Sequence, residues 1–165
     1  NATNAAWDNN TLTGGYAEQS HRGRCAVLVG GTEGVAGSYL VGDRANGKIY
    51  VQSMETYTDA GDRILRIRRC QHLSNENRRG FYGSLELDAE QGVGQADYTL
   101  RQSNDGAKSF LPNRTITANA AAGHVGRIKW KRLGSGRDRV FEVRSDSPVK
   151  HAWIDAYLEA EPGAH

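Results

Sequence analysis

The stretch HAWIDAYLEAE, residues 151–161, decides the fold class of this chain. Apolar and polar side chains alternate along it, so that every second residue faces the same side: Ala152, Ile154, Ala156, Leu158 and Ala160. A period of two is typical of a β-strand with one buried face. Strand-like segments at 126–133 and 139–144 precede it. The last third of the chain is therefore predicted to form a sheet, with Ile154 and Leu158 in its core.

Short strand segments and tight turns also recur through the first two thirds of the chain. The sequence has 20 glycines and only three prolines. Asn46-Gly47 suits a tight hairpin turn and lies between strand-like segments at 38–41 and 48–53. Residues 25–29 form a continuous apolar run, which predicts a strand buried on both faces. We expect an all-β fold of antiparallel sheets, built either as partial β-propeller blades or as a β-sandwich.

Composition divides the chain into two parts. Residues 1–23 are polar and rich in Asn, Thr and Gly, which predicts a linker or a loosely held segment. Residues 24–161 are expected to form a single β domain, since a chain of 165 residues can bury roughly 70% of its unfolded surface. The one methionine is Met54, so we expect a fragment of a longer protein. No apolar run approaches the ~18 residues that a membrane span requires, and no span is expected.

Signatures of catalysis, cofactor binding and metal binding are missing from the sequence. It contains no Gly-x-Ser-x-Gly, His-Glu-x-x-His or phosphate-binding loop motif. The five histidines lack the spacing of metal ligands, and the two cysteines, Cys25 and Cys70, form no Cys-x-x-Cys. We therefore expect no enzyme activity, no cofactor and no metal. The cysteines are expected to be free buried thiols, with a disulfide between them as the alternative.

One turn has a recognisable order of residues. Ser-x-Asp-Gly-x-x-Ser-Phe over 103–110 resembles the Asp-box, a β-hairpin turn in which the Asp side chain accepts backbone N–H bonds and an aromatic ring packs beneath. The structural residues would be Ser103, Asp105, Gly106 and Phe110. The copy is degenerate, since alanine replaces the usual second glycine. An Asp-box is a structural feature of sialidase-type β-propellers and of unrelated β proteins.

Basic residues are concentrated in one region, although the formal net charge is only +2. Residues 127–144 contain seven Lys and Arg against two acidic residues. Arg127, Lys129 and Lys131 share one face of a predicted strand, which would suit contact with DNA phosphates or with an acidic neighbouring subunit. Trp130 lies on the other face and is expected to be in the core.

Acidic residues form a row on another predicted strand: Glu86, Asp88 and Glu90. Such a row could hold a cation, act in glycoside hydrolysis or remain a solvated strand face. It could also form a salt-bridge contact with another subunit. We expect it to pair with the basic run 127–139 of a neighbouring copy, because head-to-tail contacts join two different surfaces and complementary charge sets their register.

Short motifs along residues 25–160 together resemble a known family. They are, in order, Asn46-Gly-Lys-Ile-Tyr50, Thr56-Tyr-Thr-Asp59, Arg68-Arg69, His72-Leu-Ser-Asn-Glu-Asn-Arg78, Leu85-Glu-Leu-Asp88, Glu90-Gln-Gly-Val-Gly94, the 103–110 turn, Arg127–Leu133, Arg137-Asp-Arg-Val-Phe141 and Ser145–Lys150. The ordered set resembles the C-terminal region of the packaged-DNA-stabilisation proteins of short-tailed phages and prophages. The resemblance implies a β-rich, propeller-like tail hub or nozzle subunit, which forms a ring below the portal and closes the channel after DNA packaging.

The leading hypothesis is therefore a structural virion component that closes the portal channel and retains packaged DNA. It implies a homo-oligomeric ring, contacts with portal or adaptor and with tail-needle or spike proteins, and a location in the virion tail after assembly in the bacterial host cytoplasm. The fragment alone is expected to be mainly monomeric. The first alternative is a carbohydrate-binding or glycosidase-like β-propeller domain, suggested by the Asp-box and by aromatics expected to be exposed, such as Tyr50, Tyr57 and Tyr82. The second is a non-specific nucleic-acid-binding module.

Overall fold

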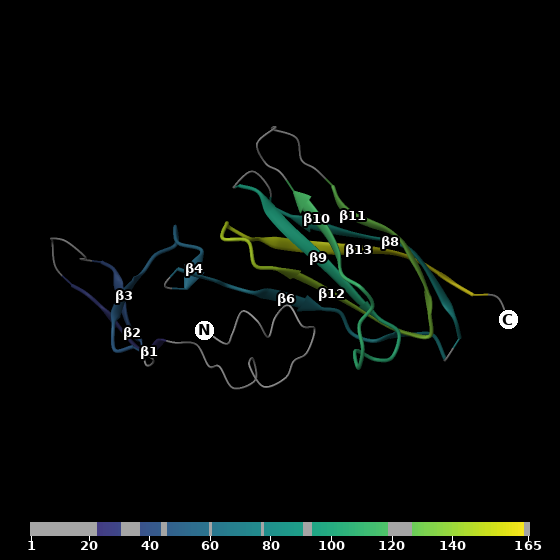
Figure 1. Ribbon diagram of the computed structural model, residues 1–165, viewed down its shortest axis with the longest axis horizontal. Helices are drawn as coiled ribbons and strands as arrows, with labels where there is room; N and C mark the ends of the chain where they lie inside the picture. Colours follow the sequence, from purple (N-terminus) through teal and green to yellow (C-terminus); the bar gives the residue numbers. More distant parts are fainter. Residues whose placement is uncertain are drawn as a thin grey trace. The chain divides into compact units, whose positions relative to one another are not determined.

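The computed structural model describes residues 23–30, 37–43, 46–59, 61–76, 78–90, 94–118 and 127–163, and the chain divides into two units, Asn1–Thr56 and Tyr57–His165. All regular secondary structure in these ranges is β-strand, which confirms the all-β prediction (Figure 1). No helix in the described part of the chain could span a membrane. The boundary between the units falls inside 24–161, where the sequence predicts a single domain. The polar segment predicted over 1–23 lies, except for Gly23, outside the described residues.

The first unit contains one three-stranded antiparallel sheet. Its strands, in spatial order, are β1 (Gly23–Leu28), β2 (Tyr39–Asp43) and β3 (Ile49–Gln52). The predicted hairpin is confirmed: Gly47 has a φ of +69°, and its N–H donates to the Asp43 carbonyl at 3.1 Å. The prediction that the first strand is buried on both faces is wrong, since Val27 is 60% exposed. One small sheet has no second layer among this unit's described residues to bury its apolar side chains.

The second unit contains two sheets and a short hairpin. The larger sheet has the order β10-β9-β12-β6, with β7 also paired to β12. Its strands are β6 (Arg66–Arg69), β7 (Leu73–Ser74), β9 (Ala96–Ser103), β10 (Arg114–Ala118) and β12 (Asp138–Ser145). The smaller sheet has the order β11-β8-β13 and consists of β8 (Gly80–Ala89), β11 (Ile128–Gly136) and β13 (Trp153–Pro162). The hairpin joins β4 (Thr58–Asp59) to β5 (Asp62–Arg63), and all of these strand pairs are antiparallel.

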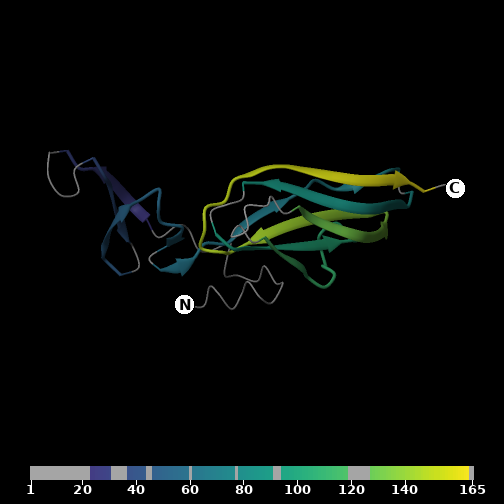
Figure 2. The same ribbon diagram turned by 90° about the horizontal axis from the view of Figure 1, so that it is seen from above.

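The two sheets of the second unit pack face to face as a β-sandwich, visible as two layers in Figure 2. Both sheets supply one apolar core: Tyr82, Leu85, Leu87, Ala89, Ala96, Tyr98, Leu100, Ile128, Trp130, Leu133, Phe141 and Val143. Trp130 is 2% exposed, so its prediction as a core residue is confirmed. Its indole N–H donates to the Arg114 carbonyl at 2.9 Å and joins the smaller sheet to the larger one. The sandwich is the second of the two architectures that the sequence left open.

Local register shifts change which residues of the last strand face the core. β13 pairs with β8, but the pairing steps from Trp153–Ala89 to Asp155–Asp88, which leaves Ile154 as an extra residue. One extra residue reverses the side on which neighbouring side chains lie, so the strict alternation predicted over 151–161 does not hold. Ile154 is 69% exposed, and its prediction as a core residue is wrong. Leu158 packs, partly buried, against the core.

Candidate functional site

The predicted basic and acidic residues lie next to each other on the outer face of the smaller sheet. β11 is the strand beside β8, and their register sets Lys129 directly opposite Glu86. Arg127 Nε lies 2.8 Å from Glu86 Oε1, and Lys129 Nζ lies 3.6 Å from Glu86 Oε2. Glu86 therefore already has two cations of its own chain beside it, and the pairing of the two sets between subunits stays a prediction.

The other members of the two sets differ in their partners. Glu90 binds Lys150, with 2.9 Å between Oε1 and Nζ. Asp88 and Lys131 are exposed and form no ion pair with another residue in the described ranges. The row of cations predicted to contact phosphates is thus reduced, since Arg127 and Lys129 share Glu86 and only Lys131 keeps an unpaired charge.

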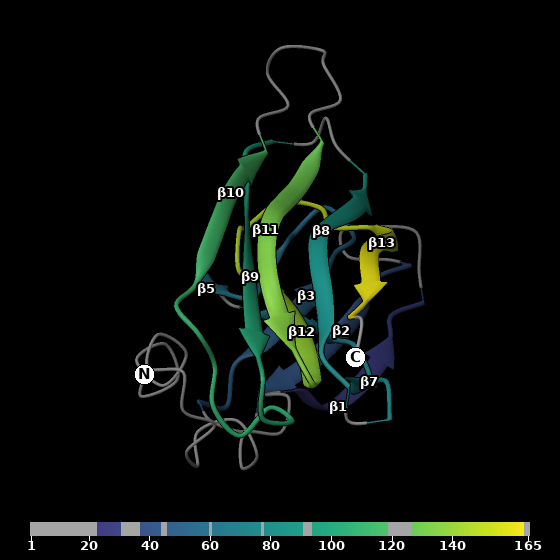
Figure 3. The same cartoon turned by 90° about the vertical axis from the view of Figure 1, so that its right-hand side faces the viewer.

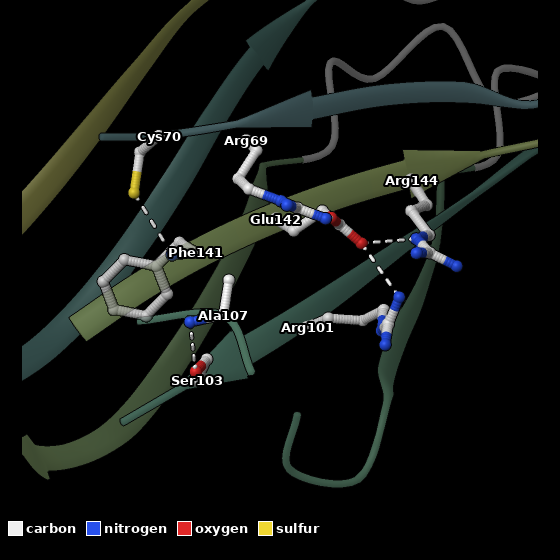
Figure 4. A network of polar contacts seen from close by, with 8 residues as sticks. All are labelled: Arg69, Cys70, Arg101, Ser103, Ala107, Phe141, Glu142 and Arg144. Carbon is white, nitrogen blue, oxygen red and sulfur yellow. Dashed lines mark hydrogen bonds and ion pairs between the residues drawn. The ribbon is translucent and has the colours of Figure 1, made fainter. Parts of the chain in front are cut away.

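A buried ionic cluster joins three strands of the larger sheet (Figure 4). Glu142 of β12 has a side chain with 0% exposure, and the register places it between Arg69 of β6 and Arg101 of β9. Arg69 Nε lies 2.7 Å from Glu142 Oε2, and Arg69 Nη2 binds the same oxygen. Glu142 Oε1 accepts Arg101 Nη1 at 3.0 Å and Arg144 Nε at 2.5 Å. One carboxylate therefore binds three arginines.

Burial and pairing oppose each other at this carboxylate. Burial alone raises the pKa of Glu142, but the hydrogen bonds and charges of Arg69 and Arg144 outweigh it, so the pKa lies below its usual range. Burial also lowers the pKa of Arg101, whose side chain is 1% exposed. The Phe110 ring centroid lies 4.0 Å from the Arg101 guanidinium carbon and 5.5 Å from that of Arg69, a cation–π arrangement. Glu142 stays ionised in the interior because the arginines neutralise it.

The cluster is a structural connection between strands. A sialidase-type site would use three arginines to receive the carboxylate of a substrate, whereas here Glu142 of the chain itself receives them. The sequence contained one signal of this cluster, because Glu142 interrupts the apolar run Val140-Phe141-Glu142-Val143 and a buried charge requires a partner. Sequence reasoning missed it, since Arg69 and Arg101 become its neighbours only when β6 and β9 pair with β12.

The turn after β9 is held by its own side chains. Ser103 Oγ donates to Asp105 Oδ1 at 2.6 Å and accepts the Ala107 N–H at 2.9 Å. The Asp105 carboxylate accepts the backbone N–H of Ser109 at 2.9 Å. Hydrogen bonds from Ser103 and Ser109 hold the pKa of Asp105 well below its usual range. The residues predicted to build this turn thus lie together, and Phe110 at its end contacts the arginines of the ionic cluster.

Gly106 packs this turn against a histidine–aspartate pair. A Cβ at Gly106 would lie 2.8 Å from Asp138 Oδ2 and 2.9 Å from His72 Cε1, and its φ is +70°, so both the space and the backbone require glycine. His72 Nδ1 lies 3.0 Å from Asp138 Oδ1. Cys70 is close by in sequence, but its Sγ accepts the Phe141 N–H at 3.1 Å and burial raises its pKa. A raised pKa disfavours the reactive thiolate.

Two further expectations about exposure are corrected. Both Cys25 and Cys70 are free, as predicted, but both residues are exposed, and of the Cys70 side chain only the thiol at the Phe141 N–H is partly buried. Of the tyrosines expected to form a carbohydrate-binding surface, Tyr82 is 8% exposed and belongs to the core, while Tyr50 and Tyr57 are partly buried. Within the described ranges, no group of three or more His, Cys, Asp or Glu is arranged to hold a metal ion.

The fold and contacts of the second unit define its class: an antiparallel β-sandwich with charged side chains on the outer face of the smaller sheet and a buried ionic cluster in the larger one. A family model described as bacteriophage P22 Gp10, β-sandwich, matches residues 66–161, more than half of the chain. The chain therefore belongs to this phage family, and the resemblance to phage tail proteins seen in the sequence is confirmed. The match begins at the first residue of β6 and ends within β13, so it covers both sheets. A search of curated proteins found no match.

Proposed function

We propose that the chain is part of a tail hub or nozzle subunit that forms a ring below the portal, closes the channel after packaging and retains the DNA. The observation that supports this proposal is the family match over residues 66–161, which spans both sheets of the sandwich. The protein would be located in the virion tail and assembled in the bacterial host cytoplasm. Its partners would be further copies of the same protein, a portal or adaptor ring, and a tail needle or spike.

The contacts within the sandwich suit a passive mechanical role. A subunit that closes a channel has to keep its shape under load. The fully buried carboxylate of Glu142 would contribute to this, because it joins three adjacent strands of the larger sheet. The bond from Trp130 to the Arg114 carbonyl connects the two sheets. These contacts hold strands together and require neither a cofactor nor a reaction. The chain would therefore act by assembly rather than by catalysis.

The charges of Arg127 and Lys129, at the start of β11, would allow DNA to pass without being held. Lys and Arg bind phosphates without sequence preference when their charge is available. Arg127 and Lys129 both contact Glu86, so part of their charge is neutralised within the chain. If this face lines a channel, it would bind DNA weakly, as the wall of a conduit requires.

Complementation tests the proposed function. Phage that lack the gene for the full-length protein should package DNA and then lose it, and wild-type protein supplied in trans should restore tailed particles that keep their DNA. The measurements are nuclease-protected DNA per head and the number of tails counted by electron microscopy. Heads that keep their DNA in the absence of the protein would contradict the proposal.

A further inference from the structure

A β-bulge places two successive cations on the exterior of the smaller sheet. The pairing of β11 with β8 shifts register between Lys131 and Gly134. Arg132, inside this bulge, has a φ of +57°, a backbone conformation that is uncommon for residues other than glycine. Lys131 and Arg132 are both exposed, and Leu133 is buried. In a regular strand, one of these two cations would face the core.

The opposite edge of the same sheet is acidic. β13 is the edge strand on the other side of β8 (Figure 3), and it contains Asp155, Glu159 and Glu161 but no Lys or Arg. All three are exposed, and none forms an ion pair with a residue that the structure describes. Asp88 lies opposite Asp155 in the register and is also exposed and unpaired in those ranges.

Two exposed apolar side chains accompany these acids. Ile154, the extra residue of the β13 bulge, is 69% exposed, and Tyr157 is 58% exposed. Tyr157 lies opposite Glu86, and the negative charge of Asp155 raises the pKa of its phenol, so the ring stands within the acidic surface. Aromatic side chains surrounded by polar groups are typical anchors of protein interfaces.

The two edges are not suited to adding a strand from another chain. Asp155 Oδ1 accepts the Ala156 N–H at 2.7 Å and so occupies a backbone donor of β13. On the other side, the Arg114 guanidinium donates to the carbonyls of Lys131 at 2.7 Å and of Arg132 at 3.4 Å. Bulges and charged side chains are the usual means by which sheets prevent edge-to-edge pairing. A contact at these edges would therefore be made by side chains.

We propose that the acidic flank, formed by Asp88, Asp155 and Glu161, contacts the basic flank, formed by Lys131 and Arg132, of a second copy of this chain. The flanks lie at opposite edges of one sheet, so the contact is head-to-tail and can close a ring when repeated. Pairing either flank with itself would oppose like charges, which disfavours a two-fold dimer. The proposal rests on the ring of the proposed function and identifies the surfaces that build it.

Charge reversal in the full-length protein tests this contact in phage particles. Lys131→Glu with Arg132→Glu, or Asp155→Lys with Glu161→Lys, should each reduce the tails assembled per DNA-filled head by about tenfold or more. All four changes together restore complementarity and should recover the wild-type count to within about twofold. The matched control reverses two exposed cations outside the basic flank, Lys48→Glu with Lys108→Glu, and should leave the count unchanged.

Cross-linking in assembled tails gives a second measurement. With Cys25 and Cys70 replaced by serine, a short bismaleimide should join subunits that contain both Asp155→Cys and Arg132→Cys, and neither change alone should give a product. Normal tail counts in both reversal variants would overturn the contact. It would also be overturned if the combined variant fails to recover assembly and no cross-linked product forms. The complementation experiment tests the proposed function separately, because it removes the whole protein and does not depend on this surface.

Discussion

Glu142→Gln tests whether one buried carboxylate holds the larger sheet together. The substitution keeps the size of the side chain but removes the anion that faces Arg69, Arg101 and Arg144, of which Arg101 is 1% exposed. Removing one partner of a buried ion pair costs about 3–5 kcal/mol. A domain has a free energy of unfolding of only about 5–15 kcal/mol. The variant should therefore lose a large share of its stability.

Equilibrium unfolding in urea, followed by tryptophan fluorescence, measures this loss, because urea leaves ion pairs unscreened. We expect a lower midpoint with an unchanged slope against urea concentration. Glu90→Gln is the matched control, since it makes the same chemical change at an exposed ion pair. The side chain of Glu90 is 38% exposed and that of its partner Lys150 is 47% exposed. Exposed pairs contribute about 0–1 kcal/mol, so the control should unfold almost as the wild type does.

The pH dependence of this difference provides a second check. The folded state lowers the pKa of Glu142 below the ordinary value for glutamate of about 4.3. Its contribution to the free energy of unfolding is therefore fully present above that value and is lost as the pH falls through the folded pKa. The difference between wild type and Glu142→Gln should be large at pH 7 and should shrink below about pH 4. A difference under about 1 kcal/mol at pH 7, or one that persists unchanged at pH 3, would refute the reasoning.

Three further predictions concern the core, the turn and catalysis. Leu100→Ala, at a fully buried position, should lower the free energy of unfolding by about 2–5 kcal/mol. Ile154→Ala, at a 69% exposed position, should lower it by less than about 0.5 kcal/mol. Urea unfolding measures both losses, and a larger loss for Ile154→Ala than for Leu100→Ala would contradict the placement of the β13 bulge. Asp105→Ala should speed hydrogen exchange at the Ser109 amide, which donates to that carboxylate at 2.9 Å, and unchanged exchange would show that the bond does not hold the turn. The purified protein should hydrolyse no sialoside, polysaccharide or nucleotide, and turnover that disappears in Glu86→Gln would count against a purely structural role.

Strand positions could be predicted because they depend on local features of the sequence. The alternation over 151–161 corresponds to β13, Trp153–Pro162, and Asn46-Gly47 does form the turn between β2 and β3. Which side chains face the core could not be predicted with the same success. Ile154 is exposed because the pairing of β13 with β8 contains an extra residue, and nothing in the sequence of β13 alone shows where that residue lies.

The charged residues of the candidate site were visible in the sequence, but their partners were not. Arg127 and Glu86 are 41 residues apart, and they meet only because β11 is the neighbour of β8. The sequence showed which charges could pair, but not that Arg127 and Glu86 meet within one chain. Glu142 shows the same limit, since its arginines come from β6, β9 and β12.

The places where the alternation fails are also the places where the smaller sheet presents unpaired groups to the exterior. The bulge in β11 exposes Lys131 and Arg132 together and holds Arg132 at a positive φ, and the bulge in β13 exposes Ile154 beside Asp155. A fold selected for stability alone would favour glycine or asparagine at a positive φ, because other side chains strain the backbone there. Positive φ also occurs at Glu76 and Ala107, so it is the exposed charge of Arg132, and not its backbone conformation, that supports the proposed contact. Bulges at both edges of one sheet thus turn Arg132 and Ile154 away from the core, beside the surfaces of the proposed contact between copies.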